Sequence, residues 1–151
     1  MPEQNTSPTT WNKKRSVLSV AGGFVVTFVA ATVLAVAARS LLPELYPDFH
    51  PSAEGRGTVS GLLLNMFFTL IASVGGGFVG AFLARRAQVN HGLAVGVASM
   101  LATFAGGAST SAAQPVWYTV GLAIALVLGG GIGGRLRKTQ IARGQRKSDG
   151  T

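Results

Sequence analysis

The chain contains no cysteine and only five acidic residues, so much of the usual chemistry of a small protein is excluded. Without cysteine it has no disulfide, no thiolate nucleophile and no cysteine-ligated metal site. Charged residues make up only 12% of the chain, whereas hydrophobic residues make up 48% and the mean hydropathy is +0.40. This balance is unusual for a soluble domain of 151 residues and is typical of a membrane protein.

Four apolar segments lack any Asp, Glu, Lys or Arg. They cover residues 16–38, 59–84, 92–108 and 116–134, and the third is the shortest. Because about 20 apolar residues in a helix cross a hydrocarbon core, we predict an all-α polytopic membrane protein with a four-helix transmembrane bundle. Ionisable side chains within membrane spans usually mark proton or ion coupling, so their absence disfavours a proton-coupled transporter.

The basic residues gather at the span ends that share one side of the membrane. They lie at residues 13–15, at 85–86 and from 135 onward, and only Arg39 and Arg56 of the 13 fall on the other side. The positive-inside rule therefore predicts cytoplasmic termini and insertion in the inner (cytoplasmic) membrane. The net charge of +8 has the same origin, so it does not indicate binding to nucleic acid.

This topology divides the chain into three parts. We expect a disordered cytoplasmic tail over 1–15, the membrane domain over 16–134 and a basic cytoplasmic tail over 135–151, with residues 39–58 as an outer loop. Basic side chains near a membrane surface attract anionic lipids. The predicted lipid or partner contacts are Arg85, Arg86, Arg135, Arg137 and Lys138.

An alternative for the first segment is a cleaved secretory signal. Such a signal has a basic start, an apolar core and a cleavage site with small residues. The chain has the same order in residues 13–15, the apolar run and Ala35-Val36-Ala37. The run is longer than the usual apolar core, and no helix-breaking residue precedes the site, so we favour a retained span. Cleavage would leave three spans and would not move the other loops.

Two glycine-rich blocks, Gly75–Gly80 and Gly129–Gly134, each match the pattern G-x-G-x-x-G. A dinucleotide site with this pattern needs a preceding strand, whereas here each block ends a predicted membrane span and is followed by arginines. Small residues four apart instead form smooth helix faces that allow close packing in lipid. The Gly/Ala-rich packing faces that we predict for the second and fourth spans contain Ala72, Gly76, Gly77, Gly80, Ala84, Gly121, Gly129, Gly130 and Gly133.

Stripes of small residues also occur in the first and third spans, at Gly23, Thr27, Ala31 and Ala35 and at Ala94, Ala98, Ala102 and Gly106. Each glycine block ends a span and precedes arginines, which indicates an internal repeat. In this repeat, spans one and two would correspond to spans three and four. Such a repeat would be parallel, with its axis along the membrane normal. A shared composition at two helix ends is the alternative explanation.

Asn65 is the most polar side chain within any predicted span. In lipid it needs a hydrogen-bond partner on another helix, so we expect an interhelical bond, with a polar pathway as the alternative. His91 precedes the third span and is a candidate ligand for a haem or a chlorophyll-type pigment, although these cofactors usually need an imidazole inside the bilayer. Our first expectation is therefore no metal site, no cofactor and no catalytic residue, and a chain that is not an enzyme.

The segment from Gly75 to Gly96, GGGFVGAFLARRAQVNHGLAVG, resembles a pattern found in small four-span bacterial membrane proteins of no assigned activity. In those proteins a glycine-rich span end, a basic pair and a His-containing turn lead into a short apolar span. The resemblance implies a four-helix membrane protein. It implies no particular chemistry and no catalytic residue.

These features favour a non-catalytic accessory or structural subunit of a larger membrane complex, because smooth helix faces without charge in the spans suit contacts with other subunits. One alternative is a small homo-oligomeric channel or transporter in which Asn65 and the glycine stripes line or gate a path. Another is a pigment- or haem-binding subunit that uses His91. The expected partners are the lipid bilayer, anionic lipids, and other membrane subunits or further copies of the chain.

Overall fold

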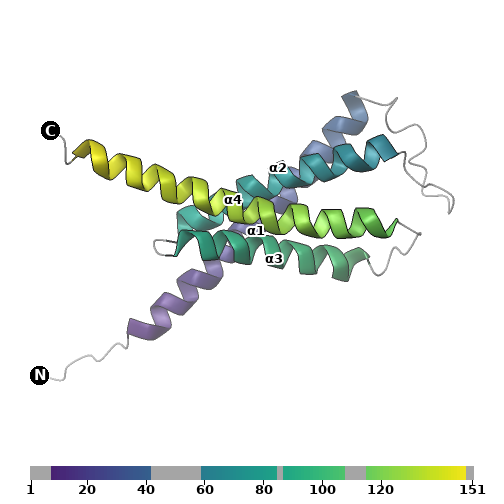
Figure 1. Ribbon diagram of the computed structural model, residues 1–151. Helices are drawn as coiled ribbons and strands as arrows, with labels where there is room; N and C mark the ends of the chain where they lie inside the picture. Colours follow the sequence, from purple (N-terminus) through teal and green to yellow (C-terminus); the bar gives the residue numbers. More distant parts are fainter. Residues whose placement is uncertain (1–7, 42–58, 85–86, 108–114, 149–151) are drawn as a thin grey trace, which may run out of the picture.

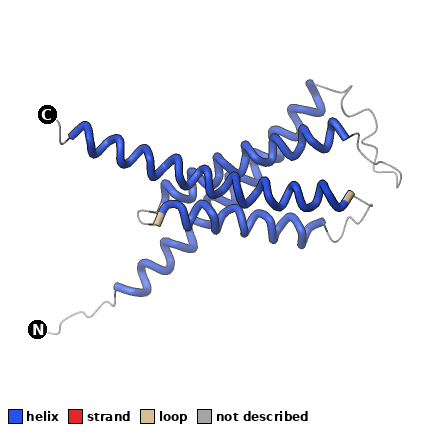
Figure 2. Tube along the Cα trace, in the orientation of Figure 1, coloured by secondary structure: helices blue, strands red, loops and turns tan. Residues whose placement is uncertain are grey.

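The computed structural model describes residues 8–41, 59–84, 87–107 and 115–148, and almost all of them are helical (Figure 1 and Figure 2). The four helices are α1 (Pro8–Leu41), α2 (Val59–Leu83), α3 (Gln88–Gly107) and α4 (Val116–Ser148). No strand occurs in these four stretches. The prediction of an all-α chain with four helices is therefore confirmed.

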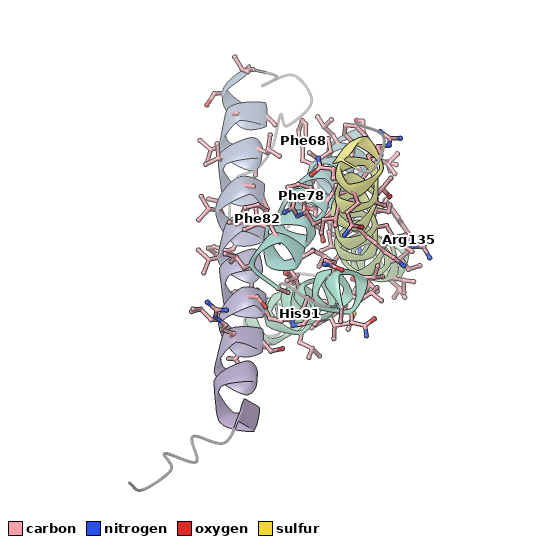
Figure 3. The ribbon with its side chains drawn as sticks, turned by 90° about the vertical axis from the view of Figure 1, so that its left-hand side faces the viewer. Phe68, Phe78, Phe82, His91 and Arg135 are labelled. Atoms are coloured by element: carbon pink, nitrogen blue, oxygen red, sulfur yellow. The ribbon has the colours of Figure 1, made fainter. Side chains whose placement is uncertain are left out.

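Successive helices run in opposite directions, so α1 and α3 run one way and α2 and α4 run the other (Figure 1). The start of α1 and the end of α4 consequently lie at the same end of the bundle. α2 packs against all three other helices, whereas α1 packs mainly on α2 and less extensively on α3. Figure 3 shows α1 to one side of the group that α2, α3 and α4 form, which makes α1 the peripheral helix.

All four helices are long and apolar enough to cross a membrane. Their apolar windows are Arg15–Ala38, Val59–Leu83, Gln88–Gly106 and Val116–Gln145. At about 1.5 Å per residue, even the shortest window, with 19 residues, reaches about 28 Å, close to the ~30 Å of a hydrocarbon core. Length and composition therefore suit a membrane protein with four spans.

Two helices extend beyond the predicted spans. α1 begins at Pro8, so the expectation of disorder over 1–15 is corrected for residues 8–15. Proline is well tolerated in the first turn of a helix, and the basic residues that follow have high helix propensity. α4 continues to Ser148, through most of the expected tail 135–151, because its Arg, Lys, Gln and Ala residues are also good helix formers. The fall in hydropathy predicts where a helix leaves the hydrocarbon core, but the helix itself continues beyond that residue.

The connection between α2 and α3 is short. The N–H of Ala84 donates to the carbonyl of Gly80 at 3.1 Å, and Ala87 then adopts a φ of 52°, which non-glycine residues rarely do. The N–H of His91 donates to the carbonyl of Ala87, so α3 begins at Gln88. The predicted third span over 92–108 therefore starts about one turn too late, and His91 lies inside the helix.

Mostly small residues fill the spaces between the helices, and most of the large apolar side chains lie outside. The buried apolar residues among those described are Ala38, Ala72, Ala81, Ala84, Val95, Tyr118, Ala125 and Leu126. The exposed ones include Val25, Phe28, Phe67, Ile124 and Leu128. A water-soluble bundle has the opposite arrangement, because only water drives large apolar groups inward, whereas lipid is as apolar as a leucine side chain.

Candidate functional site

α2 and α4 approach each other closely at glycines. A Cβ atom placed on Gly77 would lie 2.5 Å from the carbonyl oxygen of Gly130, so no side chain fits between the two backbones. Three residues further along α4, a Cβ on Gly133 would lie 2.5 Å from the backbone nitrogen of Phe78. Such proximity allows dispersion and weak Cα–H···O contacts along the interface. How much these glycines stabilise the bundle stays a prediction.

Each glycine block also packs against the helix that precedes it. A Cβ on Gly76 would lie 2.5 Å from the carbonyl oxygen of Gly23 in α1. A Cβ on Gly130 would lie 2.9 Å from the backbone nitrogen of Gly96 in α3. The second glycine of each block therefore contacts the preceding helix in both halves of the chain. The parallel repeat itself stays a prediction.

The other residues of the predicted packing faces lie mostly between helices. Ala72, Gly80, Ala84 and Gly129 are buried. Gly121 is half-buried, and a Cβ there would lie 2.7 Å from Sδ of Met66. Because a methionine side chain is flexible and can move, Gly121 is the least constrained member of the set.

The stripe predicted for the third span lies partly on an exposed face. Ala102 and Gly106 are exposed, and nothing lies within 4 Å of a Cβ added to Gly106. α3 instead presents Gly92 and Gly96 to α4, where a Cβ on Gly92 would lie 2.9 Å from Cα of Gly134. These two glycines are also four residues apart. The four-residue spacing of Gly92 and Gly96 is visible in the sequence, but such spacing does not distinguish a buried stripe from an exposed one.

Asn65 lies in the first half of α2, opposite the start of α4. Its Nδ2 donates a hydrogen bond of 2.5 Å to the hydroxyl of Tyr118, a residue that is 4% exposed. The carbonyl of Asn65 also accepts a hydrogen bond of 2.8 Å from Thr69. The amide thus has the interhelical partner that a polar group in lipid requires. A polar pathway along Asn65 stays a prediction.

Ser73 and Ser99 are two of the three serines that are almost completely buried in the described part of the chain, the third being Ser19. Ser73 donates a hydrogen bond of 2.6 Å to the carbonyl of Leu126, which links α2 to α4 through a second polar contact. The hydroxyl of Ser99 in α3 has no hydrogen-bond partner in the described part of the chain. A helical serine can donate to the carbonyl four residues earlier, so a rotation about χ1 would satisfy Ser99.

The structure brings Ser16 and His91 together at the end of the bundle where α1 begins. Oγ of Ser16 lies 2.7 Å from Nε2 of His91, and Nδ1 of the same ring lies 3.1 Å from the carbonyl oxygen of Ala87. Because a carbonyl only accepts, Nδ1 carries a proton, and Nε2 of the neutral ring accepts from Ser16. Figure 3 shows His91 beside α1. Ser16 was not singled out from the sequence, since its partner is 75 residues away.

A serine hydroxyl next to an imidazole is also the geometry of a nucleophile with its general base. Acyl transfer further needs hydrogen-bond donors directed at the developing oxyanion. Ser16 lies inside α1, where the surrounding backbone N–H groups bond to carbonyls of the same helix. We therefore interpret the pair as a contact that ties α1 to α3.

The surroundings of His91 do not favour a metal or pigment ligand. Both ring nitrogens are engaged, so coordination of a haem iron or a pigment magnesium would break one of the two contacts. Among the described residues, no group of three or more His, Asp or Glu side chains could hold a metal ion. His91 also lies in the first turn of α3, at one end of that helix.

The predicted basic contacts differ in their surroundings. Arg85 and Arg86 lie outside the described residues. Arg135 and Lys138 are exposed, and Arg135 points away from the bundle (Figure 3). Arg137 is half-buried, and its guanidinium lies 4.5 Å from the centre of the Phe82 ring in α2. This cation–π contact joins α4 to α2, a role that the sequence did not reveal.

Comparison with known proteins gives no relative, because no family model, no curated protein and no solved structure matches this chain. The resemblance to small four-span bacterial membrane proteins therefore stays a prediction. We infer the function from the surfaces and contacts of the chain itself.

Proposed function

We propose that this chain is a four-span integral membrane protein with both termini in the cytoplasm, and that it is a non-catalytic accessory or structural subunit of a larger membrane complex. The observation that carries this proposal is the exposure of α1. In its apolar window only 11% of the residues are buried within the chain, against 39% in the window of α4. Large apolar side chains such as Val25, Phe28 and Val33 therefore remain for contacts outside the chain.

The contacts inside the bundle support a structural role. The helices meet through glycine backbones, through the hydroxyl of Ser73 and through the amide of Asn65, and these groups are engaged in packing or hydrogen bonds. The Ser16–His91 pair faces no oxyanion donors from its own helix. A closely packed bundle with one peripheral apolar helix suits docking against a larger subunit.

Purification of the native protein in a mild detergent tests this proposal. Mass spectrometry of the band on a native gel should identify larger membrane subunits that comigrate with the chain in a fixed stoichiometry. A band that contains only this chain would contradict the proposal and favour a homo-oligomer, for which flux assays with Asn65 variants are the next measurement. An absorbance spectrum of the same band tests for a bound haem or pigment.

A matched pair of variants tests the role of α1. Phe28 of α1 is 66% exposed and Phe67 of α2 is 54% exposed, so both side chains face outward. The variant Phe28→Ala should reduce the amount of comigrating subunits, whereas Phe67→Ala should leave it unchanged. Equal losses in both variants, or no loss in either, would mean that α1 is not the docking helix.

A further inference from the structure

α1 and α3 diverge around a groove of about 450 Å³. It is lined by α1 residues between Ser16 and Phe24 and by Ala98 and Ala102 of α3. Apart from Ser16 at one end, the lining side chains are aliphatic or aromatic. The alanines of α3 leave this space open, because a larger side chain at either position would project into it.

The dimensions of the groove suit one lipid tail. From Ser16 to Phe24 the helix rises about 12 Å, close to the half-thickness of a hydrocarbon core of ~30 Å, so the groove spans roughly one leaflet. A volume of about 450 Å³ along that length leaves room for a slender aliphatic chain that lies lengthwise in the groove.

One end of the groove is polar, and a basic residue adjoins it in the sequence. Ser16 lies there, hydrogen-bonded to His91, and the exposed Arg15 precedes it in α1. The other end, at Phe24, is apolar. Under the proposed topology, the polar end faces the cytoplasmic head groups, where basic residues attract anionic lipids.

We propose that the groove between α1 and α3 binds one acyl chain of an anionic phospholipid from the cytoplasmic leaflet, with the lipid phosphate beside Arg15 and the Ser16–His91 pair. This inference rests on the membrane placement in the proposed function and does not require the accessory role. The apolar lining holds the tail, and the positive charge selects the head group. The site would keep a lipid in the groove between α1 and α3.

Native mass spectrometry of the detergent-purified full chain tests this site, with palmitoyl-oleoyl phosphatidylglycerol and the matching phosphatidylcholine as probes. The variant Ala102→Phe fills the groove from α3 and should weaken phosphatidylglycerol binding about tenfold, since a few buried methylene groups account for such a change. Ala105→Phe, at an exposed position of the same helix, is the matched control and should bind as the wild type does. Arg15→Gln should reduce the preference for phosphatidylglycerol over phosphatidylcholine about fivefold.

Wild-type binding by Ala102→Phe, or equal weakening by Ala105→Phe, would overturn the proposal. If Ala102→Phe instead removes a comigrating protein and leaves the lipid adduct intact, the groove is a protein-docking surface and the lipid proposal is wrong. Circular dichroism checks that each variant is helical.

A second measurement avoids any dependence on the folding of Ala102→Phe. Because the chain has no cysteine, a fluorophore on Val20→Cys in the groove or on Leu18→Cys, an exposed position outside it, is the only label. Phosphatidylglycerol with brominated tails, added in detergent at a few molecules per protein, should quench the Val20 label saturably and the Leu18 label much less. Equal quenching at both positions would contradict the groove site.

Alkaline carbonate extraction of native membranes separates the two proposals. A chain that is released into the supernatant would refute the membrane placement and with it the proposed function. A chain that stays in the membrane but shows no saturable phosphatidylglycerol binding would refute the groove alone.

Discussion

The side-chain amide of Asn65 donates a hydrogen bond to the hydroxyl of Tyr118, and the two atoms lie 2.5 Å apart across the interface of α2 and α4. Tyr118 is nearly completely buried, so neither group can readily exchange this partner for water. In the same interface Ser73 bonds to the carbonyl of Leu126, further along both helices. Two polar contacts therefore set the register in which the glycines of α2 and α4 meet.

Removal of either member of the Asn65–Tyr118 pair should destabilise the bundle by about 0.5–2 kcal/mol, the range for interhelical hydrogen bonds in membranes. Asn65→Leu and Tyr118→Phe each leave one group without its partner. The double variant should lose less than the sum of the two single losses, because either single substitution already breaks the bond between these two side chains. Reversible unfolding in mixed detergent micelles measures all four free energies of unfolding, and strict additivity would show that the contact contributes nothing.

Gly130 and Gly75 form a test of close packing, because both lie in glycine blocks but only one faces other helices. An added Cβ on Gly130 would lie 2.9 Å from the backbone nitrogen of Gly96, whereas nothing lies within 4 Å of one on Gly75. Gly130→Ala should therefore cost about 1–3 kcal/mol through overpacking. Gly75→Ala should change the free energy of unfolding by no more than about 1 kcal/mol, in the stabilising direction. Similar effects of the two substitutions in the same unfolding assay would rule out the packing interpretation.

The hydroxyl of Ser73 should contribute more than an exposed one. Ser73→Ala removes the donor to Leu126 and should destabilise the chain by about 1 kcal/mol. Ser40→Ala is the matched control, because Ser40 is exposed and its hydroxyl donates to the carbonyl of Val36 in its own helix. Thermal melts of the two purified variants measure the difference. A shift in melting temperature for Ser40→Ala as large as that for Ser73→Ala would contradict the assignment.

The proposed topology predicts opposite accessibility for the two ends of the bundle. Since the chain has no cysteine, Ser40→Cys near the end of α1 and Gly144→Cys near the end of α4 each provide one thiol. Nothing lies within 4 Å of a Cβ on Gly144, so the substitution causes no clash. A membrane-impermeant maleimide should label Ser40→Cys in spheroplasts and Gly144→Cys only after lysis. The reverse pattern would invert the topology.

Part of the candidate site could be predicted from the sequence. Asn65 is an amide in an apolar span, so its need for a hydrogen-bond partner could be predicted. The four-residue spacing of the glycines in the second and fourth spans likewise predicts helix faces that allow close approach. Which group satisfies Asn65 could not be predicted, because its partner is 53 residues away. The stripe at Ala102 and Gly106 was placed on a packing face although it is exposed, because several faces of α3 are smooth and only the neighbouring helices determine which one is buried.

The sequence by itself determined that the chain is all-α, with four helices that are long and apolar enough to cross a membrane. Uncharged apolar runs of about 20 residues form helices in lipid, since every backbone polar group there needs a partner within the segment. The tertiary structure decided that α1 is peripheral, that Gly77 meets Gly130 and that Ser16 meets His91. These contacts join residues far apart in the chain, and they depend on which pairs of helix surfaces allow the closest approach. That property belongs to two surfaces together, so the pattern along a single helix does not contain it.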